Sequence, residues 1–328
     1  MKKRVLVTGI TGYIAKHVAA QLLKQNYEVV GTIRSLAKAD ATRSALAGIP
    51  GAENVTFVEA DLLSDKGWDK AMEGTDYVIH MASPFVISEP KNESDMIAPA
   101  VDGTRRVIHA SIRAGIKRVV LTSSIVSMTS GKPSGTYGPD SWSDVDQKIG
   151  AYSKSKTLAE RAAWELVKDS SMELVAINPG FVLGPPLGPV GEGASETMVS
   201  NLIGGKMPMV PDVSMGMVDV RDVARLHVAA LEATGASGKR FIAASAVPVA
   251  FMYLAEVLKD AGYSKVKTRK APNIALKIMG LFDSEAKAMV PNLGVKISFD
   301  NRETFELLDW KPTPLEITFT DMAASLSK

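Results

Sequence analysis

The sequence contains no cysteine, and this absence excludes several kinds of chemistry. Without thiols the chain can form no disulfide, no thiolate nucleophile and no zinc–thiolate site. Histidine is scarce as well, and none of the four histidines stands in a metal-ligand spacing such as H-E-x-x-H. The four are His17, His80, His109 and His227. We therefore expect no metal site and predict that these side chains are structural.

Long apolar runs and an excess of one charge are also missing. No stretch approaches the length of a transmembrane helix, so we expect no membrane association. The 38 basic and 36 acidic residues leave a formal net charge of +2, which indicates no nucleic-acid partner. The basic N-terminus resembles a signal peptide, but threonine and glycine interrupt the apolar run between Thr8 and Gly12. We expect a cytoplasmic protein, either a monomer or a homodimer.

The chain of 328 residues is long enough for one large domain and a smaller lobe. Its first half alternates strand-like and helix-like segments, which predicts an α/β fold with a doubly wound parallel Rossmann sheet. The expected strands are 5–8, 28–33, 55–59, 77–80, 118–122, 173–178 and 240–243. The expected helices between them are 13–25, 36–47, 67–72, 95–114 and 151–168.

The texture of the sequence changes after Asn178. The following segment is rich in proline, glycine and methionine, whereas 218–231 returns to strand-and-helix patterning. We predict a Rossmann domain formed by residues 1–178 and about 217–246. A discontinuous substrate-binding lobe would comprise 179–216 and 247–328.

The stretch Arg4–His17 organises this plan. The apolar, β-branched run Val5–Val7 is typical of a buried strand, Gly9 and Gly12 follow it, and apolar residues then recur at helical intervals. A strand, a glycine turn and a helix form the first unit of a dinucleotide-binding fold, because glycine lets the backbone approach a pyrophosphate at the helix N-terminus. The motif alone leaves open a glycine turn in some other α/β protein.

A second motif, Tyr152-x-x-x-Lys156, places two side chains on one helix face. An ammonium at about 4 Å would favour a phenolate by roughly 4 kcal/mol, so we expect Lys156 to lower the pKa of Tyr152 by about three units. Upstream, an expected strand ends in Thr122-Ser123-Ser124, where ligands of open α/β sheets bind. A serine there can hydrogen-bond the substrate oxygen that the tyrosine protonates.

Together the motifs resemble the extended short-chain dehydrogenase/reductase family, also called the NAD-dependent epimerase/dehydratase superfamily. The segments that carry the resemblance are T-G-x-x-G-x-I at 8–14, D-L at 61–62, H-M-A-S-P at 80–84, D-G-T at 102–104, T-S-S at 122–124, Y-x-x-x-K at 152–156, N-P-G-x-V-x-G-P at 178–185 and V-D-V-R-D-V-A at 218–224. Within the family, G-T-I-R-S and Y-S-K-S-K-T-L-A-E-R-A-A-W resemble the branch of dihydroflavonol reductases, cinnamoyl-CoA reductases and yeast-type carbonyl reductases.

The resemblance implies a role for particular residues. Ser124 would hold the substrate carbonyl, Tyr152 would donate the proton, and Lys156 would bind the nicotinamide ribose. The cofactor would contact Thr8, Gly9, Thr11, Gly12, Tyr13, Ile14, Arg34, Lys38, Asp61, Leu62, Met81, Ala82, Ser83, Thr122, Tyr152, Lys156, Pro179, Gly180 and Val182. The substrate would contact Pro84, Phe85, Ile125, Thr129 and Phe181.

Three departures from the family pattern matter. Ala15 stands in place of the third glycine of the turn, and Asp102 replaces the usual asparagine. The cinnamoyl-CoA reductase signature N-W-Y-C-Y-G-K is absent, and Thr129 occupies the position of a flavonoid-contacting Asn or Asp. These differences argue against the two named plant activities.

Two other functions are possible on the same fold. A nucleotide-sugar epimerase or dehydratase is the main alternative, although dehydratases of the family place an acidic pair after the strand-end Thr or Ser, where this chain has Ser123 and Ser124. A non-catalytic NADP(H) sensor would typically lack the tyrosine and lysine, and both are present here. The motifs therefore favour a reductase.

The cofactor and the substrate class are predicted from charge. The second strand ends in Arg34, with Lys38 beyond it, and its acidic residue Glu28 is at the opposite end. This arrangement favours NADPH, because a guanidinium binds a 2′-phosphate. Residues 185–217 have a formal balance of −2 and five methionines, which we expect to line a pocket for a small, neutral, mostly apolar aldehyde or ketone. The reverse reaction would be an alcohol dehydrogenase.

Overall fold

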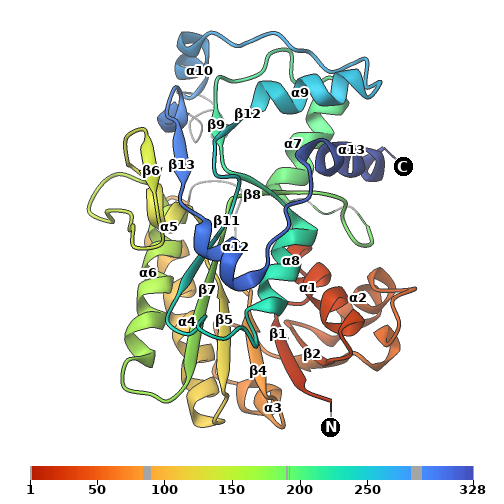
Figure 1. Ribbon diagram of the computed structural model, residues 1–328, viewed down its shortest axis with the longest axis vertical. Coiled ribbons are helices and arrows are strands. Elements are labelled where there is room, and N and C mark those ends of the chain that lie inside the picture. Colours follow the sequence, from red (N-terminus) through yellow and green to blue (C-terminus); the bar gives the residue numbers. More distant parts are fainter. Residues whose placement is uncertain (1, 84–89, 190, 192, 282–289, 328) are drawn as a thin grey trace.

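The computed structural model describes residues 2–83, 90–189, 191, 193–281 and 290–327. Figure 1 shows a twisted parallel sheet, flanked by helices, in the lower part of the molecule and a smaller lobe above it. The N-terminus lies at the foot of the sheet and the C-terminus on the upper lobe. None of the described helices is both long enough and apolar enough to span a membrane.

The central sheet has seven strands, all parallel, in the order β11-β7-β5-β4-β1-β2-β3. They are β1 (Arg4–Thr8), β2 (Glu28–Ile33), β3 (Thr56–Glu59), β4 (Tyr77–His80), β5 (Arg118–Thr122), β7 (Glu173–Pro179) and β11 (Arg240–Ala243). The strand order reverses beside β1, so a crevice is expected at the carboxyl ends of β1 and β4. The predicted fold class is confirmed.

Helices cover both faces of the sheet because the strands are apolar on both faces. Val5 and Val7 of β1 belong to the core under α1 (Tyr13–Lys24) and α8 (Val220–Ala229). Leu6 points the other way, into the core shared with three helices. These are α3 (Trp68–Met72), α4 (Ser94–Arg113) and α6 (Ala151–Val167). Short helical segments link the remaining strands: η1 (Leu36–Lys38), α2 (Ala39–Ala45), η2 (Ala52–Asn54) and α5 (Val126–Thr129).

The upper lobe has its own hydrophobic core, which includes Leu202, Phe251 and Phe319. Three helices supply most of it: α7 (Ala194–Ile203), α9 (Phe251–Asp260) and α13 (Leu315–Leu326). Three two-stranded sheets complete the fold: β8 (Phe181–Leu183) with β10 (Met217–Asp219), β9 (Ser214–Met215) with β12 (Val249–Ala250), and β6 (Gly135–Tyr137) with β13 (Ile297–Phe299). The remaining elements are α10 (Asn273–Met279), η3 (Val290–Asn292) and α12 (Arg302–Leu308).

The segment from Arg302 to Trp310 lies within the range 247–328, which we expected to form part of the substrate lobe. Leu308 and Trp310 are buried in the core under α1 and α8, so this stretch packs against the sheet domain. Whether the two parts act as separate domains stays a prediction.

The V-D-V-R-D segment at the start of α8 ties the upper lobe to the sheet domain. Asp219 caps α8 by accepting from the backbone N–H of Arg221 at 2.7 Å, and it also accepts from the Thr318 hydroxyl of α13 at 2.7 Å. Burial would raise the pKa of Asp219, but the hydrogen bonds from Arg221 and Thr318 outweigh it and lower that pKa. Asp222 in turn accepts from Trp310 Nε1 and the Thr313 backbone N–H. The motif is structural here.

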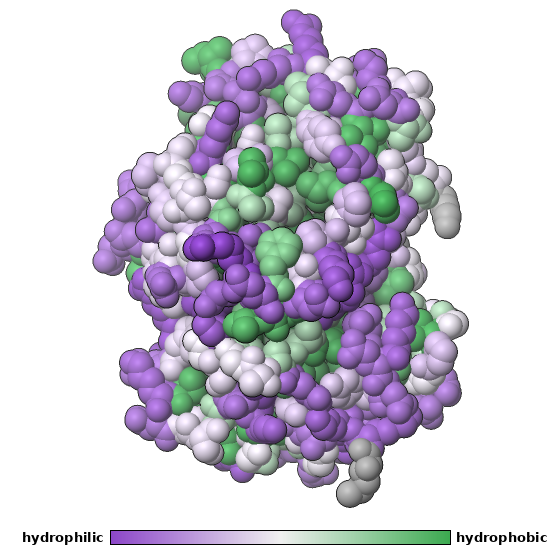
Figure 2. Space-filling view, in the orientation of Figure 1, coloured by the Kyte–Doolittle hydropathy of each residue, from purple (hydrophilic) through white to green (hydrophobic). Residues whose placement is uncertain are grey.

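The outer surface carries both polar and apolar side chains. In Figure 2 the hydrophobic side chains of this face lie in separate patches among hydrophilic ones, and the outline narrows between the lower part of the molecule and the upper lobe.

Candidate active site

A pocket of about 430 Å³ lies at the carboxyl ends of the central strands, where the upper lobe meets the sheet. Its lining residues come from β1 through the start of α1, from the ends of β4 and β5, from α6, from the β7–β8 segment, and from the beginning of α7. They are Gly9, Gly12, Tyr13, Ile14, Ala15, Met81, Ser83, Thr122, Ser123, Ser124, Tyr152, Lys156, Pro179, Gly180, Phe181, Val182, Gly193, Ala194, Ser195 and Glu196. Fourteen of the twenty are residues assigned to the site from sequence.

The glycine turn forms one wall of the pocket. Gly9 has φ +65°, and a Cβ there would lie only 3.0 Å from the Ala82 Cα, so a larger residue would strain the backbone and collide with the β4 end. Gly12 is the N-cap of α1, and because it has no side chain it does not cap the N–H groups of the first helical turn. The first turn of α1 lines the pocket, so its unsatisfied N–H groups can bind an anion such as a pyrophosphate.

Thr8 lies behind this wall and is completely buried. Its hydroxyl accepts hydrogen bonds from the backbone N–H groups of Met81 at 3.0 Å and Ala82 at 2.9 Å. It also lies 2.8 Å from Nδ1 of His80. Thr8 therefore positions the residues that line the pocket, although it does not itself line it.

Ser124, Tyr152 and Lys156 converge in the pocket from two elements. Ser124 follows β5 and is 9% exposed, and its side chain is hydrogen-bonded to Tyr152 at the start of α6. Gly150, with φ +82°, lets the chain turn into α6 immediately before this tyrosine. Lys156 follows one helical turn later, as the Y-x-x-x-K spacing predicts.

The electrostatics of these groups differ from the sequence-based expectation. Burial raises the pKa of Tyr152, and the hydrogen bond with Ser124 opposes this only in part. Burial also lowers the pKa of Lys156 to about 8, which the charge of Glu160 partly offsets. The expected depression of the tyrosine pKa by Lys156 is therefore wrong for this state of the protein, because desolvation of both groups dominates.

A second threonine–histidine pair supports the floor of the pocket. The Thr122 hydroxyl lies 2.8 Å from Nε2 of the buried His227, whose Nδ1 lies 2.7 Å from the Val223 carbonyl oxygen. Because a carbonyl only accepts, Nδ1 carries the proton, Nε2 accepts, and Thr122 donates. Burial lowers the pKa of His227 to about 4, so the imidazole stays neutral.

Several residues assigned to the cofactor do not line the pocket. Arg34 and Lys38 are exposed beyond the end of β2, Asp61 and Leu62 follow β3 along the same edge of the sheet, and Thr11 is exposed at the tip of the glycine turn. Ala82 lies directly against Gly9. Whether Arg34 and Lys38 contact the cofactor stays a prediction.

The substrate residues are placed unevenly. Phe181 lines the pocket and makes an edge-to-face contact with Phe251, with ring centroids 5.8 Å apart. Ile125 packs toward Met128 and its neighbours, and the Thr129 hydroxyl donates to the Ile125 carbonyl oxygen, so neither lines the described pocket. Pro84 and Phe85 lie outside the described residues.

Six lining residues were not assigned to the site from sequence: Ala15, Ser123 and the segment 193–196. The carboxylate of Glu196 accepts from the Gly191 backbone N–H at 2.9 Å and is buried at the start of α7. The segment falls within the range 185–217 expected to border the pocket, but no local pattern places a helix start above the glycine turn. The sequence G-A-S-E at 193–196 resembles a helix N-cap followed by an apolar helix, and this was the signal from which the start of α7 could have been predicted.

The methionines of 185–217 lie elsewhere than expected. Met217 is buried in the core of the upper lobe, and Met198, Met207 and Met215 pack against that core. None of the described residues of the pocket is one of the five. Met198 and Met207 also border a small cavity with Leu202 and Phe251, so these flexible apolar side chains fill the interior of the lobe. Their expected role as the lining of the substrate site stays a prediction.

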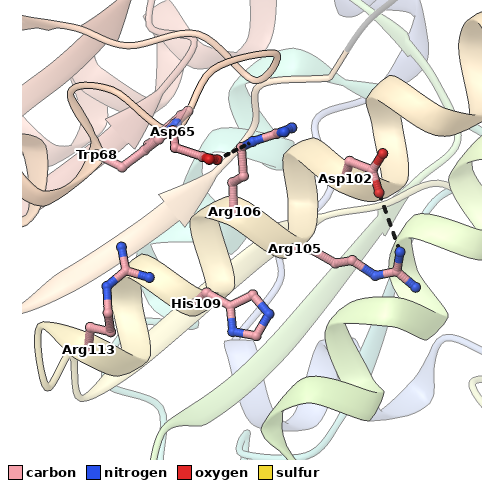
Figure 3. Close-up of a pocket in the computed structure, with 7 residues that line it drawn as sticks. All are labelled: Asp65, Trp68, Asp102, Arg105, Arg106, His109 and Arg113. Atoms are coloured by element: carbon pink, nitrogen blue, oxygen red, sulfur yellow. Dashed lines mark hydrogen bonds and ion pairs between the residues drawn. The ribbon is translucent and has the colours of Figure 1, made fainter.

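Figure 3 shows a second, more open pocket on the outer side of α4, away from this chemistry. Three arginines line it, and each has an aspartate partner: Arg106 with Asp65 at 2.6 Å, Arg113 with Asp69 at 2.7 Å, and Arg105 with Asp102 at 3.3 Å. Asp102, which replaces a family asparagine, thus makes a surface ion pair. The described residues contain no cluster of His, Cys, Asp and Glu suited to a metal ion.

The sheet order, the glycine turn and the Ser–Tyr–Lys pocket define a short-chain dehydrogenase/reductase. The chain belongs to the NAD dependent epimerase/dehydratase family, whose model matches residues 5–244.

Individual relatives are reductases. The chain is 39% identical to cinnamoyl-CoA reductase 1 of Arabidopsis thaliana over 251 residues, which cover 74% of this chain and 71% of that protein. It is 30% identical to the NADPH-dependent methylglyoxal reductase Gre2 of Saccharomyces cerevisiae over 266 residues, 74% of this chain and 78% of Gre2. The crystal structure of yeast Gre2 complexed with NADPH matches with a TM-score of 0.79 and 26% identity over 98% of each chain.

Proposed function

We propose that this protein is an NADPH-dependent carbonyl reductase that acts on a small, neutral, mostly apolar aldehyde or ketone. The observation that carries the proposal is the convergence of Ser124, Tyr152 and Lys156 in one pocket whose opposite wall is the glycine turn. The relatives named above are reductases, and one of them is NADPH-dependent by name. Under suitable conditions the same site would oxidise the corresponding alcohol.

The pocket fits the cofactor at several points. Gly9 and Gly12 line the pocket without side chains, and the first turn of α1 offers N–H groups for the pyrophosphate. Arg34, exposed just beyond β2, is available for charge-assisted hydrogen bonds to the 2′-phosphate. Lys156 would hold the nicotinamide ribose. When bound, NADPH supplies the hydride that the carbonyl carbon receives.

The protein's own part of the reaction is to bind and protonate the carbonyl oxygen. Ser124 donates a hydrogen bond to that oxygen, and Tyr152 transfers its phenolic proton to it. Because burial raises the tyrosine pKa, Tyr152 is protonated at neutral pH and is ready to donate. The Lys156 ammonium, with a pKa of about 8, is mostly protonated at pH 7 and stabilises the phenolate that forms as the proton leaves.

The charge of the pocket supports a neutral substrate. Among the described lining residues the charged side chains are Lys156 and Glu196, and the rest are glycine, apolar residues, small hydroxyl residues and the tyrosines Tyr13 and Tyr152. A nucleotide sugar carries a diphosphate, which requires arginine or lysine donors beyond those used by the cofactor. Tyr13, Phe181 and Val182 instead offer apolar and aromatic surface.

The test is NADPH oxidation, followed at 340 nm, across a panel of aldehydes, ketones and nucleotide sugars. We expect turnover with several neutral aldehydes and ketones and none with nucleotide sugars. Tyr152→Phe should abolish it, whereas Tyr137→Phe, which removes a hydroxyl that donates to the Pro133 carbonyl oxygen far from the pocket, should not. Turnover confined to UDP- or dTDP-sugars would replace the reductase by an epimerase or dehydratase.

A further inference from the structure

A buried ion pair lies directly behind the wall of the pocket. Glu160 follows Lys156 by one turn of α6, and its carboxylate is fully buried. Arg240, from β11, donates through Nε to Oε1 at 2.6 Å and through Nη2 to Oε2 at 3.1 Å. The two residues are 80 positions apart in the sequence, so only the fold brings them together.

The arginine is held in one place by all of its N–H groups. Its Nη1 donates to the carbonyl oxygens of Pro139 and Ser141, each at 2.6 Å, and its Nη2 also donates to the Ser127 hydroxyl at 3.1 Å. The Trp142 ring stacks on the guanidinium, with the carbon 3.8 Å from the ring centroid. Because the Arg240 guanidinium is held in place, its two hydrogen bonds also hold the Glu160 carboxylate in place.

The Glu160 carboxylate in turn accepts hydrogen bonds from residues on both sides of Ser124. Its Oε2 accepts from the Ser123 hydroxyl at 2.5 Å and from the Ser127 hydroxyl at 2.7 Å. It also accepts from Asn178 Nδ2 at 3.1 Å, and the same amide group donates to the Ser124 carbonyl oxygen at 3.2 Å. Because the residues before and after Ser124 share this anchor, the carboxylate sets the position of the serine that meets Tyr152.

The same carboxylate is the acidic group that acts on Lys156. Burial lowers the pKa of Lys156 to about 8, and the negative charge of Glu160 opposes that decrease. The other titratable groups near the ammonium are not anionic: the pKa of His80, on β4, is lowered to about 3, and Tyr152 is protonated because its pKa is raised. Arg240 lowers the pKa of Glu160 and so keeps the carboxylate ionised.

We propose that Glu160 is a positioning residue for the reduction: it fixes the turn that carries Ser124 and keeps the Lys156 ammonium charged at neutral pH. The proposal rests on the function proposed above. Stability alone gives little reason for such a pair, because well-packed apolar residues often replace a buried ion pair without loss. The adjacent site gives a reason for the Glu160–Arg240 pair, because Glu160 acts on both the segment around Ser124 and the charge of Lys156.

The test measures the protonation of Lys156 directly. Protein with ¹³C at the lysine Cε atoms is titrated by NMR, and the Lys156 signal is assigned as the one absent from Lys156→Met. Residues one helical turn apart lie about 6 Å apart, so at an effective dielectric of about 20 the loss of one charge should lower the Lys156 pKa by about one to two units in Glu160→Gln. In the pH profile of kcat/KM, the apparent pKa of the fall on the alkaline side should decrease by the same amount. The variant should therefore lose activity roughly tenfold or more at pH 8, and this loss should become smaller toward pH 6.

Trp164→Phe is the matched control. It removes the indole N–H that donates to Glu160 Oε1 at 3.2 Å but leaves the charge, so the Lys156 titration should not move. If Glu160→Gln fails to fold because Arg240 is left unpaired, Glu160→Gln combined with Arg240→Met removes both charges. The Lys156 pKa should then still fall, but by less, because the loss of the more distant arginine cation partly offsets the loss of the carboxylate.

An unchanged Lys156 titration in a folded Glu160 variant would overturn the effect of Glu160 on the lysine. Unchanged kcat/KM at pH 6, where Lys156 is mostly charged in both proteins, would overturn its role in positioning Ser124. The NMR titration needs no substrate. A wild-type protein that reduces no carbonyl while Lys156 still shifts in the variant would therefore contradict the proposed function and not the effect of Glu160 on the lysine.

Discussion

The hydroxyl of Thr8, at the end of β1, lies 2.8 Å from Nδ1 of His80, at the paired position on β4, and accepts from the two backbone N–H groups that follow this histidine. One buried side chain thus joins the strand that precedes the glycine turn to the strand that leads to Met81 and Ala82. This junction positions the pocket wall where the cofactor is expected to lie.

Thr8→Val tests this junction. The substitution keeps the shape of the side chain but leaves two partly buried N–H groups without an acceptor, at a cost of about 1–2 kcal/mol each, the lower part of the range for buried groups. We expect the free energy of unfolding to fall by about 2–4 kcal/mol and the Kd for NADPH to rise, as measured by denaturant unfolding and cofactor fluorescence. Thr11→Val, at an exposed position of the same turn, is the control and should change the stability little. Equal stability of the two variants would contradict the assignment.

Removing the tyrosine hydroxyl tests the proposed proton donor. Tyr152→Phe should lower kcat by roughly a hundredfold or more while the Kd for NADPH stays within a few-fold, because the phenol acts on the substrate. Lys156→Ala should lower kcat and also weaken NADPH binding, because the lysine is expected to hold the ribose. Stopped-flow kinetics and fluorescence titration separate the two effects. Near-normal turnover by Tyr152→Phe would exclude this mechanism.

Cofactor choice depends on Arg34 in our interpretation. A charge-assisted hydrogen bond contributes about 1.5–3 kcal/mol, so Arg34→Ala should reduce kcat/KM for NADPH by roughly ten- to a hundredfold and leave kcat/KM for NADH nearly unchanged. Arg105→Ala removes an exposed arginine on α4 and should leave the ratio of the two values as in the wild type. Equal kcat/KM for both cofactors in the wild-type protein would show that Arg34 is only a surface charge.

Acid should destabilise the protein through its buried histidines. The pKa of His227 is about 4 in the folded state, below the ordinary value of 6.5, so the unfolded chain binds more protons between these values. Stability is therefore complete above about pH 6.5 and is lost as the pH falls toward 4, by about 3 kcal/mol for this residue. His227→Gln should flatten the fall of the melting temperature between pH 6.5 and 4. The same slope in the variant would assign the acid sensitivity to other groups.

Much of the fold was predictable because its signals are local. Strands Glu28–Ile33, Tyr77–His80 and Arg118–Thr122 have the bounds expected from their apolar runs, and α6 begins at Ala151, one residue before the tyrosine of Y-x-x-x-K. The lobe was harder to predict, because three-residue strands such as β8 and β10 pair across the 33 positions of 184–216 and leave no periodic pattern.

The sequence by itself determined the sheet class, the glycine turn and the identities of Ser124, Tyr152 and Lys156, since each depends on residues close together in the chain. Only the tertiary structure decided what surrounds them. It brought the start of α7 and the glycine turn into one pocket, and it put Met198, Met207, Met215 and Met217 in or against the core of the lobe. It also set Glu160 against Arg240 behind the serine. Burial decided the pKa values as well, because desolvation depends on every atom packed around a group and not on the spacing of two residues in the sequence.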